Sequence, residues 1–372
     1  MPESARRDAP ALALSGGGFR ATLFHCGTFI RLNELGFLAR MERISAVSGG
    51  AIAAGMLAAA WPRLRLKGAR FTNLEEAVIA PLQSFCTRTI DKAAVGWGAL
   101  LPGKSIGDVL ADIYDEMYEG RTLAELPDTP QFVFNATNLQ TGRLVRMQKL
   151  RLADYSIGEI RQPKLRLAVA VAASSAFPPV LSPVTVAAGA VGRWSDLAGT
   201  SHFGDPAFTR TLSLTDGGAY DNLGLETVDD FAPLFVSDAG APFTIDAEAG
   251  LLWPQQLMRV LDIATDQARA LRKRFLHRSR GAAPGQPAAR PFAFAGIDGD
   301  PADYPAARKL ATDPRLTRGL ARLRTRLNPF SEEEQGRLIN WGWSMTDLAA
   351  RSYVDTAAPA PTAWPRPRWA LG

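Results

Sequence analysis

The sequence predicts an α/β protein built on a largely parallel β-sheet. Between residues 11 and 240, short apolar runs typical of buried strands alternate with segments whose apolar side chains recur at helical spacing. Two junctions between a strand and a helix, Ser15–Gly18 and Ser48–Gly50, are rich in glycine and serine. Parallel strands gather their carboxyl ends at one edge of a sheet, where α/β proteins place their functional groups. We therefore expect a functional site at these junctions.

The first two strand–helix units are clear from local pattern. Residues 11–14 form an apolar run that ends in glycines, and residues 21–35 have a helical apolar face that Gly36 ends. A β-favouring run at 43–47 is followed by an Ala-, Ile- and Met-rich segment at 49–60, typical of a buried helix.

The remaining elements of this half follow by the same rules. Ser105 is a good N-cap for a helix, and two strand-like runs flank the Thr141-Gly142 turn. A small apolar segment ends before Pro178 and Pro179, and two more strand-like runs follow it. We expect a helix at 105–118, strands at 132–137 and 143–147, a helix at 165–176, and strands at 212–215 and 234–238.

Beyond residue 250 the pattern becomes mostly helical. The expected elements are a helix with one apolar face through Leu257 and Phe275, a Gly/Ala/Pro linker at 281–289, a strand at 292–297, a helix around 316–327 and a last helix at 340–353. The sequence thus predicts a catalytic domain at 1–250, a mostly helical C-terminal extension at 251–356 packed on it, and a disordered Pro-rich tail at 357–372.

Composition excludes several classes of protein. The 372 residues are 47% hydrophobic and 21% charged and contain no run of eighteen apolar residues, so we expect a globular protein without a transmembrane helix. No long apolar stretch lies between Arg7 and the glycine loop, which argues against a secretory signal. Cys26 and Cys86 are too few for a disulfide framework and show no zinc spacing, so a cytoplasmic location without a zinc site is expected.

Ser48 lies in a predicted tight turn between a strand and a helix. Such an elbow exposes a nucleophilic hydroxyl, Gly49 and Gly50 leave room for the turn and the substrate, and the helix directs its positive end at the site. Ala46 replaces the first glycine of the G-x-S-x-G pattern. The alternative is a serine that only N-caps a buried helix.

A glycine loop lies upstream. The N–H groups of Gly17 and Gly18 can converge on negative charge that develops on a carbonyl oxygen, and Arg20 either braces the loop or adds positive charge. A phosphate-binding loop is the weaker alternative, because neither G-x-x-x-x-G-K-[ST] nor a full G-x-G-x-x-G is present.

Serine requires a base, and the histidines are poor candidates. His25 is interpreted as a buried structural residue, and neither His202 nor His277 has the surroundings of a triad histidine. Asp216, between a strand and two glycines, is the better candidate, and an apolar pocket would raise its pKa toward that of a useful base. An Asx-turn is the alternative role for an Asp-Gly pair.

Taken together, these motifs resemble those of the patatin-like phospholipases over residues 11 to about 240. The matching segments, in chain order, are Ser15–Arg20, Val47–Gly50, Asn135–Gly142, Ala172–Pro179 and Asp216–Gly218. The resemblance implies a three-layer α/β/α sandwich with a mostly parallel central sheet and a Ser–Asp dyad without histidine. It further implies Ser48 as nucleophile, Asp216 as general base, and an oxyanion hole formed by Gly16, Gly17, Gly18 and Arg20.

The activity implied is hydrolysis of lipid acyl esters, of phospholipase A or lysophospholipase type, without a metal. A transacylase with the same dyad and a non-catalytic lipid- or protein-binding member remain alternatives. The net charge of +5 is compatible with anionic lipid, with nucleic acid or with solubility alone and does not choose among them. The segment Arg269–Arg280 has the pattern of a basic amphipathic helix at an inner membrane face. Solvated outer faces of packed helices are the alternative, and no nucleic-acid-binding module is evident. The sequence leaves the oligomeric state open.

Overall fold

A computed structural model describes residues 7–90, 105–178, 181–248, 250, 252–280 and 290–372. At its centre is a parallel sheet in the order β5-β2-β1-β12-β13. These strands are β1 (Arg7–Leu14), β2 (Arg43–Ala46), β5 (Gln131–Asn138), β12 (Phe231–Asp238) and β13 (Phe292–Gly296). The linker predicted at 281–289 lies outside the described residues.

Antiparallel strands extend the sheet beyond β5. A meander of β6 (Arg143–Gln148), β7 (Arg151–Asp154), β8 (Gly158–Arg161) and β10 (Trp194–Ser195) follows on one edge. On the other side of β5, which it shares with β2, β11 (Thr211–Asp216) pairs antiparallel with the end of β5. Strand β11 also pairs antiparallel with β9 (Val184–Ala187). The expected parallel sheet is therefore confirmed at the centre, whereas the strand that carries Asp216 runs the opposite way.

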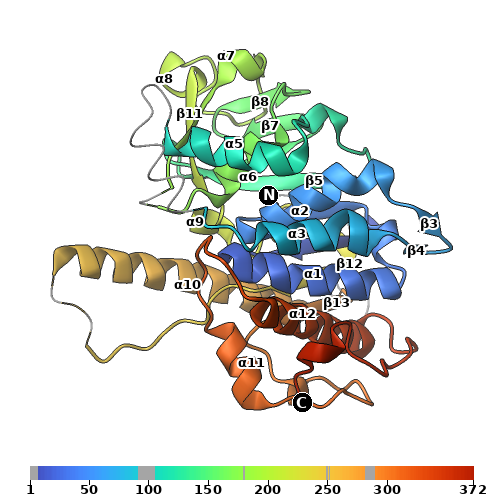
Figure 1. Cartoon of the computed structure of the whole chain (residues 1–372). Helices are drawn as coiled ribbons and strands as arrows, with labels where there is room; N and C mark the ends of the chain where they lie inside the picture. Colours follow the sequence, from blue (N-terminus) through green and yellow to red (C-terminus); the bar gives the residue numbers. More distant parts are fainter. Residues whose placement is uncertain (1–6, 91–104, 179–180, 249, 251, 281–289) are drawn as a thin grey trace.

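Helices cover both faces of this sheet, as the three-layer expectation requires. One face packs against α1 (Gly18–Glu34), α2 (Gly49–Ala60), α3 (Ala80–Phe85), α5 (Ile106–Tyr118), α6 (Leu167–Ser175) and α12 (Glu332–Tyr353) (Figure 1). The other face is covered by α9 (Gly218–Asp221), the chain that follows it and the C-terminal end of α10 (Trp253–Arg280). Alternate side chains of β1 enter the two cores, since Leu12 and Leu14 face one and Ala11 and Ala13 the other.

The helix starts agree with the sequence prediction at α2 and α5 and differ from it at α12. The range 49–60 is that of α2, and Ser105 forms a capping box with Asp108 at the start of α5. A second box, Ser331 with Glu334, starts α12 eight residues before the predicted helix. The smaller elements are β3 (Leu66–Lys67), β4 (Arg70–Phe71), the π-helix η3 (Glu75–Ile79), α7 (Ala188–Val191), α8 (Pro206–Thr209) and α11 (Pro314–Ala321).

The C-terminal region completes the same core and does not form a separate unit after residue 250. Strand β13 adds an edge strand to the central sheet beside β12. Helix α12 lies along α1, where Arg31 and Arg351 both pair with the buried Asp347, at 2.6 and 2.7 Å. The tail at 357–372 is also packed, contrary to the expected disorder. Leu371 is fully buried, and the side chain of Asn340 on α12 donates to the carbonyl of Trp369 at 2.7 Å. The tail is ordered because its apolar residues pack on the rest of the protein.

We predict that the close contact between α1 and α12 tolerates no side chain at Gly342. A Cβ added there would lie 1.9 Å from the Phe24 carbonyl oxygen, so Gly342→Ala must push two helix backbones apart and should destabilise the protein by about 3 kcal/mol. The matched control is Gly319→Ala in α11, where nothing lies within 4 Å and a gain of about 1 kcal/mol is expected. Urea denaturation measures both, and equal stabilities would contradict the tight contact.

Candidate active site

Strand β5 brings Ser48 and Asp216 together. Along one edge of β5, Ala46 at the end of β2 pairs with Phe134, and Asp216 at the end of β11 pairs with Ala136. Because β2 runs parallel to β5 and β11 runs antiparallel, the carboxyl ends of the two strands approach each other head to head. The turns that follow both strands therefore leave the sheet at the same point.

Ser48 adopts the strained backbone of a nucleophile elbow. Its φ of 53° and ψ of −119° are rarely adopted by a residue with a side chain, and its hydroxyl makes no capping bond to α2. The capping alternative therefore finds no support. A Cβ on Gly49 would lie 2.1 Å from the Gly18 carbonyl oxygen, so the elbow packs directly on the glycine loop. Ala46 lies within β2 rather than in the turn, which explains why glycine is not needed there.

Asp216 is a buried carboxylate with one oxygen held and the other free. Oδ1 accepts a hydrogen bond from the N–H of Gly218 at 2.6 Å, the Asx-type contact that the sequence allowed. Oδ2 is buried and has no hydrogen-bond partner among the described residues. Burial raises the pKa of Asp216 from 3.8 to about 6, although the Ser48 hydroxyl and the Gly218 N–H both act to lower it. The carboxylate thus combines a raised pKa with an unused acceptor beside Ser48.

The glycine loop lies against the elbow, with two of its N–H groups unused. A Cβ on Gly16 would be 3.1 Å from the Cβ of Ser48. The N–H of Gly16 donates to the carbonyl of Asn222 at 3.0 Å, whereas in the described part of the chain those of Gly17 and Gly18 meet no acceptor. Gly17 and Gly18 have φ values of 143° and 56°, which only glycine adopts readily. Of the three expected donors, Gly17 and Gly18 are therefore available for an oxyanion.

Arg20 braces the glycine loop from behind. Its guanidinium is buried and donates to the carbonyls of Ala239 and Ala321 at 2.8 Å and of Leu323 at 2.7 Å. Both terminal nitrogens are engaged there, whereas Nε is buried without a hydrogen-bond partner among the described residues, so these contacts support the bracing role.

His25 also positions the loop and cannot serve as the base. Its Nε2–H donates to the carbonyl of Ser15 at 2.9 Å, and Nδ1 accepts from the Ser237 hydroxyl at 2.8 Å. Burial lowers the pKa of His25 to about 4, so the ring is neutral. The chain of hydroxyls continues from Ser237 through Thr28 to Thr346 on α12.

Ser174, for which the sequence suggested no role, joins the turns that follow β2 and β11. Its carbonyl accepts the N–H groups of both Ser48 and Gly217 at 3.2 Å, and its hydroxyl donates to the carbonyl of Asn135 at 2.7 Å. The Ser48 N–H also lies 3.0 Å from this hydroxyl. Its place in the Ala/Ser-rich segment of the resemblance was the one available signal.

The other two histidines lie elsewhere. His202 stacks on Phe208, and His277 lies on α10 beside Phe292. Among the described residues no cluster of His, Cys, Asp or Glu could hold a metal ion, and no helix has both the length and the apolar character to cross a bilayer.

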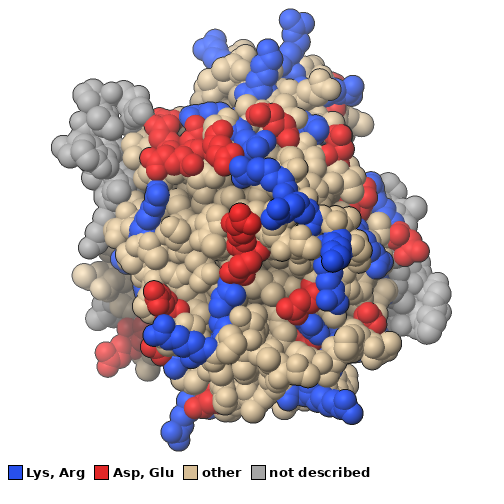
Figure 2. All heavy atoms as spheres, turned by 45° about the vertical axis from the view of Figure 1, so that its right-hand side comes forward, with Lys and Arg blue, Asp and Glu red and all other residues tan. Residues whose placement is uncertain are grey.

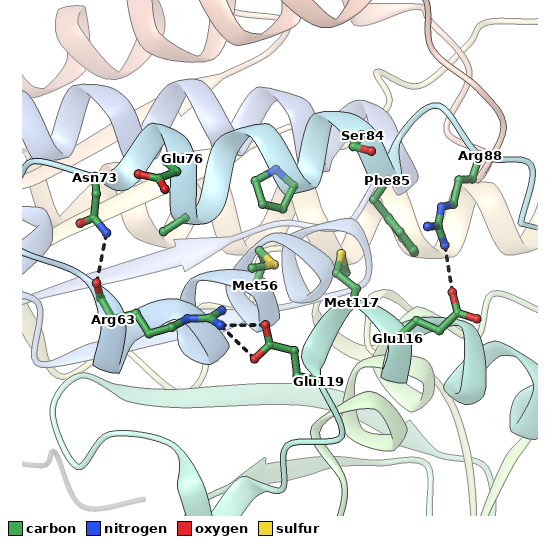
Figure 3. A pocket seen from close by; sticks show the side chains of 12 residues that line it. Met56, Arg63, Asn73, Glu76, Ser84, Phe85, Arg88, Glu116, Met117 and Glu119 are labelled. Carbon is green, nitrogen blue, oxygen red and sulfur yellow. Dashed lines mark hydrogen bonds and ion pairs between the residues drawn. The ribbon is translucent and has the colours of Figure 1, made fainter.

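A pocket of about 540 Å³ between α3 and α5 does not include the dyad. Met56 of α2 and Phe85 line it, and the ion pairs Arg63–Glu119 and Arg88–Glu116 bridge it (Figure 3).

The comparisons with known proteins match the fold described above. The sequence model described as patatin-like phospholipase matches residues 12–229, which include all the site residues above. Human GIVD cytosolic phospholipase A2 has the same fold, with a TM-score of 0.54 at 13% identity over 92% of this chain and 59% of that one. The chain thus spans less than two-thirds of that protein.

More distant matches are VipD from Legionella pneumophila and ExoU of Pseudomonas aeruginosa in complex with SpcU. VipD has a TM-score of 0.36 at 12% identity, over 94% of this chain and 68% of that one. ExoU has a TM-score of 0.26 at 19% identity, over 47% and 39%. No curated protein matches the sequence.

We predict that Ser174→Ala lowers the reactivity of Ser48. Without the hydroxyl, the elbow loses one of the contacts that fix its position, and a small misplacement of a reacting group typically costs about a hundredfold in rate. The rate of labelling by a fluorophosphonate measures this. Ser175→Ala is the matched control, because the Ser175 hydroxyl contacts Val171 and Tyr114 and not the dyad. Equal labelling rates for both variants would refute the role of Ser174.

Proposed function

Because the chain belongs to the patatin-like phospholipase family, a family of lipid ester hydrolases, we propose that it cleaves fatty-acyl esters of lipids through an acyl-enzyme on Ser48. Asp216 is the general base, and the N–H groups of Gly17 and Gly18 form the oxyanion hole. The observation that carries the proposal is the head-to-head meeting of β2 and β11, which sets a strained serine beside a buried carboxylate with a free oxygen.

The proposed reaction has two halves. Asp216 takes the proton of the Ser48 hydroxyl as Oγ attacks the ester carbonyl carbon, and the glycine loop stabilises the oxyanion. The alkoxide leaving group departs with the proton from Asp216. Water then attacks the acyl-enzyme, again giving a proton to Asp216, and Ser48 recovers its proton as the fatty acid leaves. No step requires a metal or a cofactor.

The alternatives differ in measurable ways. A transacylase would use the same first half and pass the acyl group to an alcohol, so it would yield a new ester when an acceptor is supplied. A binding member would not label with a fluorophosphonate. The unused donors of Gly17 and Gly18 favour a catalytic role over that reading.

We predict that the protein releases fatty acid from mixed phospholipid vesicles in the presence of EDTA. Ser48→Ala and Asp216→Asn should each lower release by about 10⁴-fold, because a nucleophile and its base act as a unit. Ser213→Ala, a half-buried serine on the same strand as Asp216, is the matched control and should retain activity. Release that survives Ser48→Ala would sink the mechanism.

The pH dependence follows from the raised pKa of Asp216. A general base works only when ionised, so kcat/KM should rise with pH through a midpoint of about 6 and stay level at higher pH. Because His25 has a pKa of about 4 and is neutral above it, it adds no second limb in this range. Initial rates between pH 4 and pH 8 measure the profile. A midpoint near the ordinary aspartate value of 3.8 would contradict a buried base.

A further inference from the structure

The C-terminal part of α10 is fastened to the molecule by its basic residues. Arg269 pairs with Asp238 at 2.7 Å, Lys273 with the same carboxylate at 2.8 Å, and Arg272 with Asp221 at 3.3 Å. Arg280 lies over the rings of Phe292 and Tyr353. The sequence suggested that Arg269–Arg280 as a whole would face a membrane, but four of its six cations face the protein.

The two remaining cations and most of α10 are exposed. Arg274 and Arg278 point outward, and no residue before Arg269 in this helix is buried. One face of the helix carries an apolar stripe made of Trp253, Leu257, Val260, Ala264, Leu271 and Phe275. Four of these side chains, Trp253, Leu257, Val260 and Phe275, keep 60 to 75% of their surface accessible, unusual for large apolar residues so close together.

Charge on α10 is sorted around this stripe. At a helical repeat of 3.6 residues, Arg274 lies at the side of the stripe and Arg278 continues its line beyond Phe275. Asp262 and Asp266 fall on the far side of the helix. An apolar face bordered by cations and free of carboxylates is complementary to an anionic lipid surface. By contrast, the face in Figure 2 shows cations and carboxylates interspersed, with no single basic patch.

The fastened end of α10 lies next to the edge of the sheet that carries Ser48 and Asp216. Asp238, the anchor of Arg269, is the last residue of β12, and Asp221 closes the short helix α9 that directly follows Asp216. From this root α10 projects away from the body, with its N-terminal end farthest out (Figure 1). Chain segment 240–248 runs beside it, since Arg259 donates to the carbonyl of Thr244, and adds the exposed Ile245.

We propose that the apolar stripe of α10 docks on the surface of an anionic lipid bilayer and turns the catalytic edge toward it. The stripe lies in the boundary between headgroups and acyl chains, and Arg274 and Arg278 contact anionic headgroups. The proposal rests on the function proposed above only in taking a lipid as the substrate. Docking itself needs no catalysis and is therefore measurable on an inactive protein.

The test is flotation of the full chain carrying Ser48→Ala with two kinds of vesicle, phosphatidylcholine alone and an equimolar mixture with phosphatidylserine. Adding Leu257→Glu should weaken binding to the mixed vesicles by about tenfold, because a charge replaces an inserted side chain. Adding Arg274→Gln with Arg278→Gln should weaken it by about thirtyfold on the mixed vesicles and little on phosphatidylcholine. The matched control is Leu150→Glu, a leucine of similar exposure (54% against 62%) in the turn between β6 and β7, which should bind like the parent.

Three outcomes would overturn the proposal. The first is equal binding of Leu257→Glu and Leu150→Glu. The second is no vesicle binding by the parent protein. The third is a dimer in light scattering that Leu257→Glu dissolves while vesicle binding is absent, which would assign the stripe to a second copy of the chain.

Hydrolysis of a soluble short-chain ester by the wild type distinguishes a failure of the docking proposal from a failure of the proposed hydrolase function. Soluble ester turnover without vesicle binding removes only the docking surface, and vesicle binding without any turnover removes only the activity.

Discussion

The site depends on one edge of one strand. Strand β5 offers a single row of backbone groups to two strands that arrive from opposite directions, and only Asn135 separates the residue that pairs with Ala46 from the one that pairs with Asp216. Neither strand can continue without meeting the other, so both must turn out of the sheet there. The side chain of Asn135 fills this junction and donates to Ser45 and to the carbonyl of Ala46. The closeness of Ser48 and Asp216 is thus a property of the sheet and not of flexible loops.

Burial of the Asp216 carboxyl at this junction lowers the stability of the fold at neutral pH. In the pH window between 3.8 and about 6, the folded protein holds a proton on Asp216 that the unfolded chain has already released. Stability contributed by this group therefore falls as the pH rises through that window, by about 3 kcal/mol in total.

Local chemistry explains which features the sequence predicts well. The glycine loop, the elbow and the cap at Ser105 are written in neighbouring residues, and all were found where expected. The direction of β11, the contacts of Ser174 and the partners of Arg20 depend on residues that are distant in the chain, so no local pattern contains them. The same reason explains the wrong prediction for the basic segment of α10. Its sequence alone does not tell whether an arginine pairs with Asp238 or faces solvent.

The brace behind the glycine loop has a consequence for the order in which the protein matures. Arg20 is held by the carbonyls of Ala321 and Leu323, and a Cβ on Gly18 would lie 1.6 Å from the carbonyl oxygen of Thr325. A nascent chain on the ribosome therefore holds Ser48 and Asp216 long before it holds the segment against which the loop is shaped. A partly made chain that ends before residue 321 therefore carries Ser48 and Asp216 without the contacts that shape the glycine loop.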